Sequence, residues 1–413
     1  MPPEPPAAPD RWYAARLRAV WVLWFVVLVA LLSRGLIAPN KNSCFRDHYR
    51  PAGVNWLNGN ELYSSTADTC RYSPAVHVAL VPFSALPERW GAFAWRLVQA
   101  SALFVAVWWW LRTVCPAALD DRHRSWVLFL TLPLCTGSLN NGQSNVLMTA
   151  GVLACVAAVV GRYWTLAAVA IAVACLFKIY PIAMALLIVV LYPRQFGSRF
   201  VLALLAGLAL PFAFQNPEYV ARQYGRWFEN LKGDDRSGWV LDEAYRDAWL
   251  LVRVTGLPLS VEAYRLLSVG AGAALGAFCV ALRLRGDSGP ELVNRVLGLG
   301  CCWMTAFGPA TESPTYILLG PTVGWLLVES WRGAHPRWTR VPVTLAAGLF
   351  FTTVLAATTP PYGRQLMMLG TQPAASLLLL FTLVTVCVVR PARPTERAAV
   401  LPFDSRPPVR NAA

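Results

Sequence analysis

Charged side chains are scarce in this chain of 413 residues: they make up only 14% of it, against about 25% in an average soluble domain. Hydrophobic residues make up 56%, and the mean hydropathy is +0.46. Such a composition excludes an ordinary water-soluble enzyme as well as a disordered or collagen-like chain. At roughly 20 apolar residues per membrane span, the sequence has room for about a dozen spans. The composition therefore predicts an all-α polytopic membrane protein.

Several kinds of site are also missing. No glycine-rich loop precedes a helix, so no nucleotide site is indicated. The net charge of +14 comes without a nucleic-acid-binding motif, so we expect no nucleic-acid partner. Four histidines lack metal-ligand spacing: His48, His77, His123 and His335. The acidic pairs Asp120–Asp121 and Asp234–Asp235 are weak metal candidates, and we expect the second pair to be solvated. No metal and no cofactor is therefore expected.

The hydrophobic segments predict twelve transmembrane helices. The first is an uncleaved signal anchor, because its apolar run is too long for a signal peptide and lacks a cleavage site. The expected spans are 19–38, 89–111, 125–138, 145–160, 163–177, 180–193, 199–214, 261–283, 295–310, 314–331, 341–358 and 374–390. They form one domain over 19–390, between an N-terminal tail (1–18) and a C-terminal tail (391–413) that we expect to be disordered.

Arginines in the short loops predict the orientation. Cytoplasmic loops carry an excess of basic residues, and with twelve spans every short basic loop falls on the side of the N-terminal arginines. These loops contain Arg112, Arg122, Arg124, Arg162, Arg194, Arg199, Arg283, Arg285, Arg295, Arg332, Arg337 and Arg340. Both termini are therefore expected in the cytoplasm, in a multi-pass protein of the cell membrane.

Two long loops, about 39–88 and 215–260, then lie on the outer side. Within the first, the apolar stretch 72–87 is broken by Pro74, Pro82 and Pro87. We interpret it as an interfacial or re-entrant helix at the outer face. A full span is the alternative, and it would disturb the agreement between the charges of the upstream loops and the predicted orientation.

Asp47 is the first candidate for chemistry. A carboxylate just outside a span is by itself most simply a solvated loop residue. Around it, however, aromatic and polar groups alternate: His48, Tyr49, Asn55, Trp56 and Asn58. In such a setting a carboxylate can take a proton from a hydroxyl, as a general base does, and the aromatic and amide groups suit sugar recognition.

A second candidate is the run Asn140-Asn141-Gly142-Gln143-Ser144-Asn145 at the outer end of a helix. Helix capping by asparagine or serine explains one or two of these residues. It does not explain Gln143 beside two asparagines. Polar residues at membrane depth are costly and tend to be functional, so Asn140, Asn141, Gln143 and Asn145 are expected to contact a sugar.

Lys178 stands alone between two apolar runs and is followed by Pro181. One interpretation is a lysine that snorkels from a helix end to the membrane surface. The other is a cation that faces a phosphate. Short, proline-broken hydrophobic segments are where membrane proteins tend to build substrate sites.

Three further residues lie at outer helix junctions: Glu312, Tyr316 and Arg364. Each taken alone is more simply structural. Cys44 and Cys70 both lie in the first outer loop, where an oxidising compartment would allow a disulfide. Two unpaired thiols are the alternative, because the sequence does not place the Cα atoms of the two residues within bonding reach.

The order of these motifs resembles a known family. The Asp47 region, YSP and VPFSALP, then NNGQSN, LFKIYP and SPTY, over about residues 19–330, are similar to glycosyltransferase family 87. This family comprises GT-C-type membrane enzymes that use polyprenyl-phosphate sugars. The SPTY segment lacks the histidine that usually precedes the aromatic residue of the family's late motif.

The resemblance implies a GT-C-like helical bundle with its active site on the outer face. The donor would be a polyprenyl-phosphate hexose, with mannose expected, and the acceptor a lipid-linked or other glycan. Transfer would proceed with inversion at the anomeric carbon. Asp47 would be the general base and Lys178, aided by Arg364, would stabilise the departing phosphate. Gln143 and Asn145, with His48, Tyr49, Asn140, Asn141, Glu312 and Tyr316, would contact donor or acceptor.

A secondary transporter or lipid flippase is the main alternative, since twelve spans with broken helices also suit transport. Two features argue against it. No repeat relates the two halves of the chain, and the polar residues gather on one face instead of at the membrane midplane. A non-catalytic membrane assembly factor is a third possibility.

Overall fold

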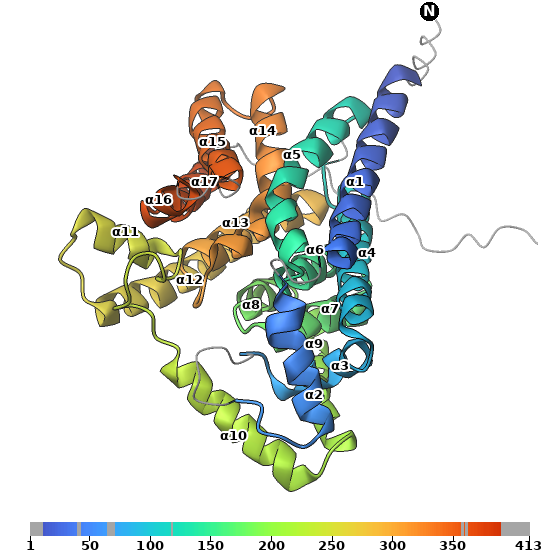
Figure 1. Ribbon diagram of the computed structural model, residues 1–413. Coiled ribbons are helices and arrows are strands. Elements are labelled where there is room, and N and C mark those ends of the chain that lie inside the picture. The colour runs from blue at the N-terminus through green and yellow to red at the C-terminus, as the bar shows by residue number, and fades with distance from the viewer. Residues whose placement is uncertain are drawn as a thin grey trace, which may run out of the picture.

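A computed structural model describes residues 11–38, 43–63, 71–116, 119–356, 359 and 362–389. All regular structure in these residues is helical, and they contain no strand (Figure 1). The helices of the first half are α1 (Arg11–Ile37), η1 (Phe45–Tyr49), α2 (Arg50–Leu57), α3 (Pro74–Ser84), α4 (Glu88–Thr113), α5 (Asp121–Asn141), α6 (Asn145–Val160), α7 (Trp164–Phe177), α8 (Ile182–Leu191), η2 (Pro193–Gly197), α9 (Ser198–Ala209) and η3 (Leu210–Ala213).

The second half continues with α10 (Pro217–Gly233), α11 (Ala248–Thr255), α12 (Val261–Leu284), α13 (Gly289–Ala306), η4 (Ser313–Leu319), α14 (Gly320–Trp331), η5 (Arg337–Thr339), α15 (Arg340–Ala356), α16 (Tyr362–Met368) and α17 (Thr371–Val389). Local signals explain several boundaries. Asp120 caps α5 by accepting a hydrogen bond from the backbone N–H of His123 (2.9 Å). Asn216 caps α10 in the same way, and Pro217 occupies its first turn.

Six helical segments among the described residues are long and apolar enough to cross a membrane: Trp12–Ile37, Glu88–Thr113, Pro193–Ala213, Val261–Leu284, Arg337–Ala356 and Thr371–Val389. Together with the family described below, they support an all-α, multi-pass membrane protein. The predicted number of twelve spans is not confirmed. At 1.5 Å per residue, α7 with its 14 residues extends about 21 Å, less than the hydrocarbon core of about 30 Å.

The short helix α6 lies inside the bundle. α6 packs between α4 and α7, and most of its side chains are buried. Gly151 permits the contact with α7, because a Cβ there would come within 2.8 Å of the Ala170 carbonyl oxygen. α6 is apolar because protein surrounds it, whereas α7 and α8 also have exposed apolar side chains, such as Leu166 and Leu186.

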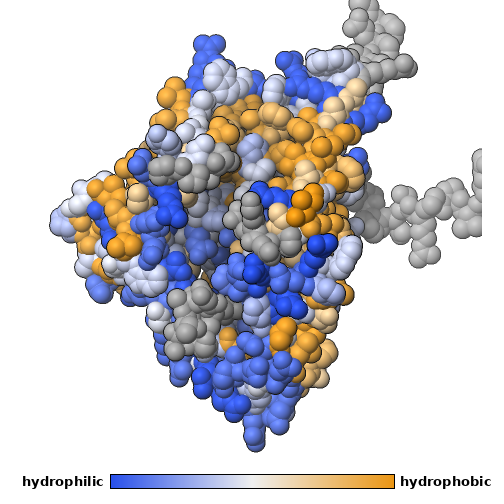
Figure 2. Space-filling model, viewed as in Figure 1, coloured by the Kyte–Doolittle hydropathy of each residue, from blue (hydrophilic) through white to orange (hydrophobic). Residues whose placement is uncertain are grey.

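The first predicted outer loop and the α10 part of the second lie together at one end of the molecule. Figure 1 shows α2, α3 and α10 at the end opposite the start of α1, and in Figure 2 hydrophilic side chains gather there. Trp56 of α2 packs on Tyr219 of α10, with ring centroids 5.8 Å apart, in a small separate hydrophobic cluster. The Arg226 side chain of α10 also pairs with Glu61 (3.1 Å). Residues some 160 positions apart therefore form one structural unit.

Candidate functional site

A cavity of about 700 Å³ lies between the two outer loops and the ends of the bundle helices. The first loop contributes Cys44, His48, Tyr49, Arg71 and Tyr72, and the α5–α6 and α7–α8 junctions contribute Gln143, Asn145, Lys178 and Tyr180. The second loop and its neighbours complete the lining with residues that include Trp227, Asp234, Asp235, Arg236, Tyr245, Asp247, Trp249, Tyr264, Arg265, Trp303 and Glu312. The cavity is therefore lined by both charged groups and aromatic rings, as are sites that bind polar ligands such as sugars.

The α5–α6 junction is held from behind by α4. Gly142 adopts a left-handed conformation (φ 64°) that ends α5. Its carbonyl accepts hydrogen bonds from Trp95 Nε1 (2.9 Å) and from Gln99 Nε2 (3.1 Å). These contacts fix the turn and leave the side chain of Gln143 at the cavity wall. Within the described part of the chain, Gln143 Oε1 is buried and has no hydrogen-bond partner, so it can accept one from a ligand.

A tyrosine pair ties the first loop to this junction. The hydroxyls of Tyr49 and Tyr72 lie 3.0 Å apart. The backbone N–H of Ser144 donates to Tyr49 (3.0 Å), and its hydroxyl donates to Tyr72 (2.8 Å). Burial raises the pKa of the Tyr49 hydroxyl well above its ordinary value. Tyr49 therefore stays neutral, and its hydrogen bonds position the first loop against the bundle.

Lys178 occupies the break between α7 and α8. Its backbone is extended (φ −144°, ψ 143°), and Pro181 caps the start of α8. The half-buried side chain reaches the cavity, with Nζ 5.9 Å from the centroid of the Tyr180 ring. No acidic side chain of the described residues forms an ion pair with it within 4 Å; Glu312 is the carboxylate that attracts it most strongly. Burial lowers the pKa of this ammonium group, and an anionic ligand beside it would favour its charged form.

The arginines of the cavity are, in contrast, paired with acids. Arg71 Nη1 lies 2.5 Å from Asp234 Oδ2 and 3.1 Å from the Tyr245 hydroxyl. Arg265 pairs with Asp235 at 2.8 Å. The Asp234 side chain is only 12% exposed. The expectation that this acidic pair is solvated is therefore wrong for Asp234, whereas the Asp235 side chain is 48% exposed although it pairs with Arg265.

Asp247 is a buried acid that faces the same cavity. It immediately precedes α11 and is only 8% exposed. Its Oδ1 atom has no hydrogen-bond partner among the described residues. Burial raises the pKa of this carboxyl from 3.8 to about 7. Sequence reasoning missed it, as it missed Arg71, Tyr72 and Tyr264.

Seven of the residues predicted from the sequence lie on the cavity wall: Cys44, His48, Tyr49, Gln143, Asn145, Lys178 and Glu312. Asp47 is not part of the wall. It lies on the single turn of η1, between the wall residues Cys44 and His48 in the chain, and its side chain is exposed.

The remaining predicted residues lie elsewhere. Asn140 and Asn141 bond to each other (3.2 Å) at the end of α5, outside the wall. Tyr316 is buried, and its hydroxyl donates a hydrogen bond to the Arg246 carbonyl (2.6 Å). This bond holds Arg246, which directly precedes Asp247 in the chain. Arg364 is exposed and lies 3.4 Å from Asp242. Cys70 lies outside the described residues, so its pairing with Cys44 stays a prediction.

Comparison with known families gives one match. Residues 71–307, more than half of the chain, match the family described as glycosyltransferase family 87. The matched region contains Gln143, Asn145, Lys178 and the entire second outer loop, whereas Asp47 precedes it. No curated protein matches the chain.

Proposed function

We propose, from the premise that the chain belongs to glycosyltransferase family 87, that it transfers a hexose from a polyprenyl-phosphate donor to a lipid-linked or other glycan acceptor. The family makes the protein a membrane glycosyltransferase. The finer assignment is that mannose is transferred, on the outer face of the membrane, with inversion at the anomeric carbon.

The observation that carries this proposal is the position of Lys178. It is a half-buried cation on the wall of an aromatic-rich cavity, without an acid within ion-pairing distance among the described residues. A phosphate leaving group develops negative charge as the glycosidic bond breaks, and a preorganised cation stabilises that charge. Gln143 and Asn145 lie on the same wall and would bind sugar hydroxyls through their amides. Arg364 could assist only if its side chain left Asp242 and paired with the phosphate instead.

A lipid-borne donor is supported by the way α12 borders the cavity. Tyr264, Arg265 and Ser268 of this candidate span line the cavity. Leu266 of the same helix is 75% exposed, as expected of a side chain that faces lipid. A polyprenyl chain could therefore remain in the bilayer beside α12 while its phosphate and sugar enter the cavity.

Asp47 is proposed as the general base. Its exposed side chain, on the same turn as the cavity residue His48, suits contact with an acceptor that enters from outside. In a single displacement, the carboxylate takes the proton of the acceptor hydroxyl while the hydroxyl oxygen attacks the anomeric carbon. The bond from that carbon to the phosphate oxygen breaks, and the phosphate leaves with the electron pair beside Lys178.

The test is a donor comparison with the purified, reconstituted full chain. Synthetic polyprenyl-phosphate mannose, polyprenyl-phosphate glucose and the corresponding nucleotide sugars are each incubated with a panel of glycolipid acceptors. The products are identified by mass spectrometry, and their anomeric configuration is determined by NMR. The proposal expects a mannosylated product of inverted configuration from the polyprenyl-phosphate donor alone. Transfer from a nucleotide sugar and from no polyprenyl-phosphate sugar would overturn it.

A further inference from the structure

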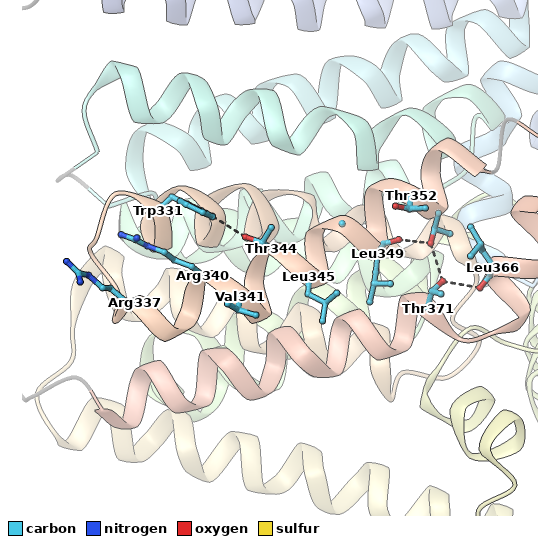
Figure 3. A pocket seen from close by; sticks show the side chains of 12 residues that line it. Trp331, Arg337, Arg340, Val341, Thr344, Leu345, Leu349, Thr352, Leu366 and Thr371 are labelled. Atoms are coloured by element: carbon cyan, nitrogen blue, oxygen red, sulfur yellow. Dashed lines mark hydrogen bonds between the residues drawn. The ribbon is translucent and has the colours of Figure 1, made fainter.

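A second hollow, a groove of about 760 Å³, runs along α15 between α14, α16 and α17, and it shares no residue with the cavity described above. Figure 3 shows Trp331, Arg337 and Arg340 at one end of this groove and Leu366 and Thr371 at the other. Between the two ends, the side chains are those of Val341, Thr344, Leu345, Leu349, Thr352 and Thr353. One end is thus basic and aromatic, and the rest is mostly apolar.

The polar atoms in the length of the groove are largely satisfied by the protein. Trp331 Nε1 donates to the Thr344 hydroxyl (3.1 Å). The Thr353 hydroxyl bonds to the Leu349 carbonyl (2.7 Å), and the Thr371 hydroxyl bonds to the Leu366 carbonyl (3.0 Å). Figure 3 shows these bonds as dashed lines. A ligand along this length therefore needs no polar groups to satisfy the groove, and a hydrocarbon chain can bind there without leaving polar atoms unpaired.

The basic end of the groove is suited to binding an anion. Arg340 Nε bonds to the Ser330 carbonyl (3.2 Å), and its guanidinium lies 5.3 Å from the centroid of the Trp331 ring. Neither Arg337 nor Arg340 pairs with an acid of the described residues, whereas their neighbour Arg332 is paired with Glu329 (2.9 Å). Two uncompensated guanidinium groups beside a tryptophan are well suited to a phosphodiester, which they can bind through several hydrogen bonds.

The groove is shorter than the hydrocarbon core of a bilayer. From Arg340 to Thr353, at 1.5 Å per residue, α15 extends about 20 Å, whereas the hydrocarbon core of a bilayer is about 30 Å thick. The basic end lies at the α14–α15 turn, which Figure 1 shows at the end of the molecule opposite α2 and α10. A headgroup bound there is consequently far from the cavity proposed for the sugar donor.

We propose that this groove binds an anionic glycerophospholipid, with its phosphate at Arg337 and Arg340 and one acyl chain along α15. Basic pockets between membrane helices are a known form of lipid recognition. The arginine pattern of the sequence predicts that the 332–340 segment lies on the cytoplasmic side, and the lipid would then come from the inner leaflet.

The experiment measures lipid binding to the purified, delipidated full chain by native mass spectrometry. Phosphatidylglycerol and phosphatidylcholine with identical acyl chains are titrated separately. Arg337→Gln/Arg340→Gln removes the basic end, and Arg194→Gln/Arg199→Gln is the matched control with the same loss of charge elsewhere. Gly348→Leu fills the groove, since a Cβ at Gly348 meets nothing within 4 Å, and Gly276→Leu, equally unobstructed on α12, is its control.

We expect the native chain to bind phosphatidylglycerol at least about tenfold more tightly than phosphatidylcholine, a difference of about 1.4 kcal/mol. The Arg337/Arg340 variant should lose this preference and its control should keep it. Gly348→Leu should weaken both lipids and Gly276→Leu neither. Equal binding of the two lipids, equal losses in both arginine variants, or displacement of phosphatidylglycerol by polyprenyl phosphate would each overturn the proposal. If the Arg337/Arg340 variant does not fold, the leucine pair and the lipid preference of the native chain decide.

Discussion

Replacement of Asp247 by asparagine should stabilise the protein above neutral pH. The side chain is 8% exposed, and Oδ1 has no hydrogen-bond partner in the described part of the chain. Ionisation at this position therefore costs free energy that an exposed carboxylate does not pay. Asparagine keeps the shape of the side chain and removes the charge.

The sign and size follow from the raised pKa. Burial moves the pKa of Asp247 from 3.8 to about 7 in the folded protein. Between these two pH values the unfolded chain has lost the proton and the folded chain still holds it. The folded state therefore binds more protons than the unfolded state, and its stability falls as the pH rises. A shift of about three units corresponds to roughly 4 kcal/mol as an upper limit, and this loss is complete above about pH 7.

The assay compares thermal unfolding of the native chain and of Asp247→Asn in detergent at about pH 5 and about pH 8, followed by tryptophan fluorescence. The variant should gain stability over the native chain at the higher pH, and most of this gain should be absent at the lower pH. Asp242→Asn, at an exposed carboxylate of the same loop, is the matched control and should show no such pH dependence. The same difference between variant and native chain at both pH values would refute the reasoning.

Four further predictions concern the proposed function and the orientation. Asp47→Asn should lower transfer by on the order of 100-fold while the unfolding temperature stays unchanged; near-normal turnover would contradict the base assignment. Lys178→Ala should raise the KM for the lipid donor, with partial rescue in Lys178→Arg, whereas Lys232→Ala, on the last turn of α10, should leave it unaltered; unchanged donor kinetics in Lys178→Ala would favour the snorkelling interpretation. Single cysteines at Ser65 and Ser237, in a cysteine-free background, should both react with an impermeant thiol reagent from outside; labelling of only one would place the loops on opposite sides. Non-reducing peptide mapping should find Cys44 bonded to Cys70, stabilising the fold by roughly 3 kcal/mol; alkylation of both without reduction would exclude the bond.

The sequence predicts where helices lie better than it predicts what surrounds them. The predicted segment 89–111 lies within α4 (Glu88–Thr113), and 145–160 has the bounds of α6. Both segments are apolar, but one is long enough to cross a bilayer and the other is surrounded by protein. Periodicity and hydropathy report that a helix avoids water. They do not report whether lipid or protein replaces the water.

The site shows a similar division. Lys178 and Gln143 could be found from the sequence because a polar residue beside long apolar runs stands out. Arg71 and Asp247 could not, because a charged residue within a polar loop has no such contrast, and Asp234 stood out only as part of an acidic pair. Their importance depends on contacts such as Arg71 with Asp234, which join residues separated by 163 positions. Only the tertiary structure brings these residues to one cavity.

The charges of the cavity suggest why a lysine, in place of an arginine, would meet the donor phosphate. Arg71 and Arg265 are committed to Asp234 and Asp235, so much of their charge is compensated and their hydrogen-bond donors are partly used. These pairs link the second outer loop to the first loop and to α12, and they give the cavity a fixed wall. Lys178 forms no ion pair with a described acid within 4 Å, and it extends from a helix break that α7 and α8 hold in place. In the proposed reaction, the paired arginines would maintain the shape of the site, and the lysine alone would respond to the charge that develops on the departing phosphate.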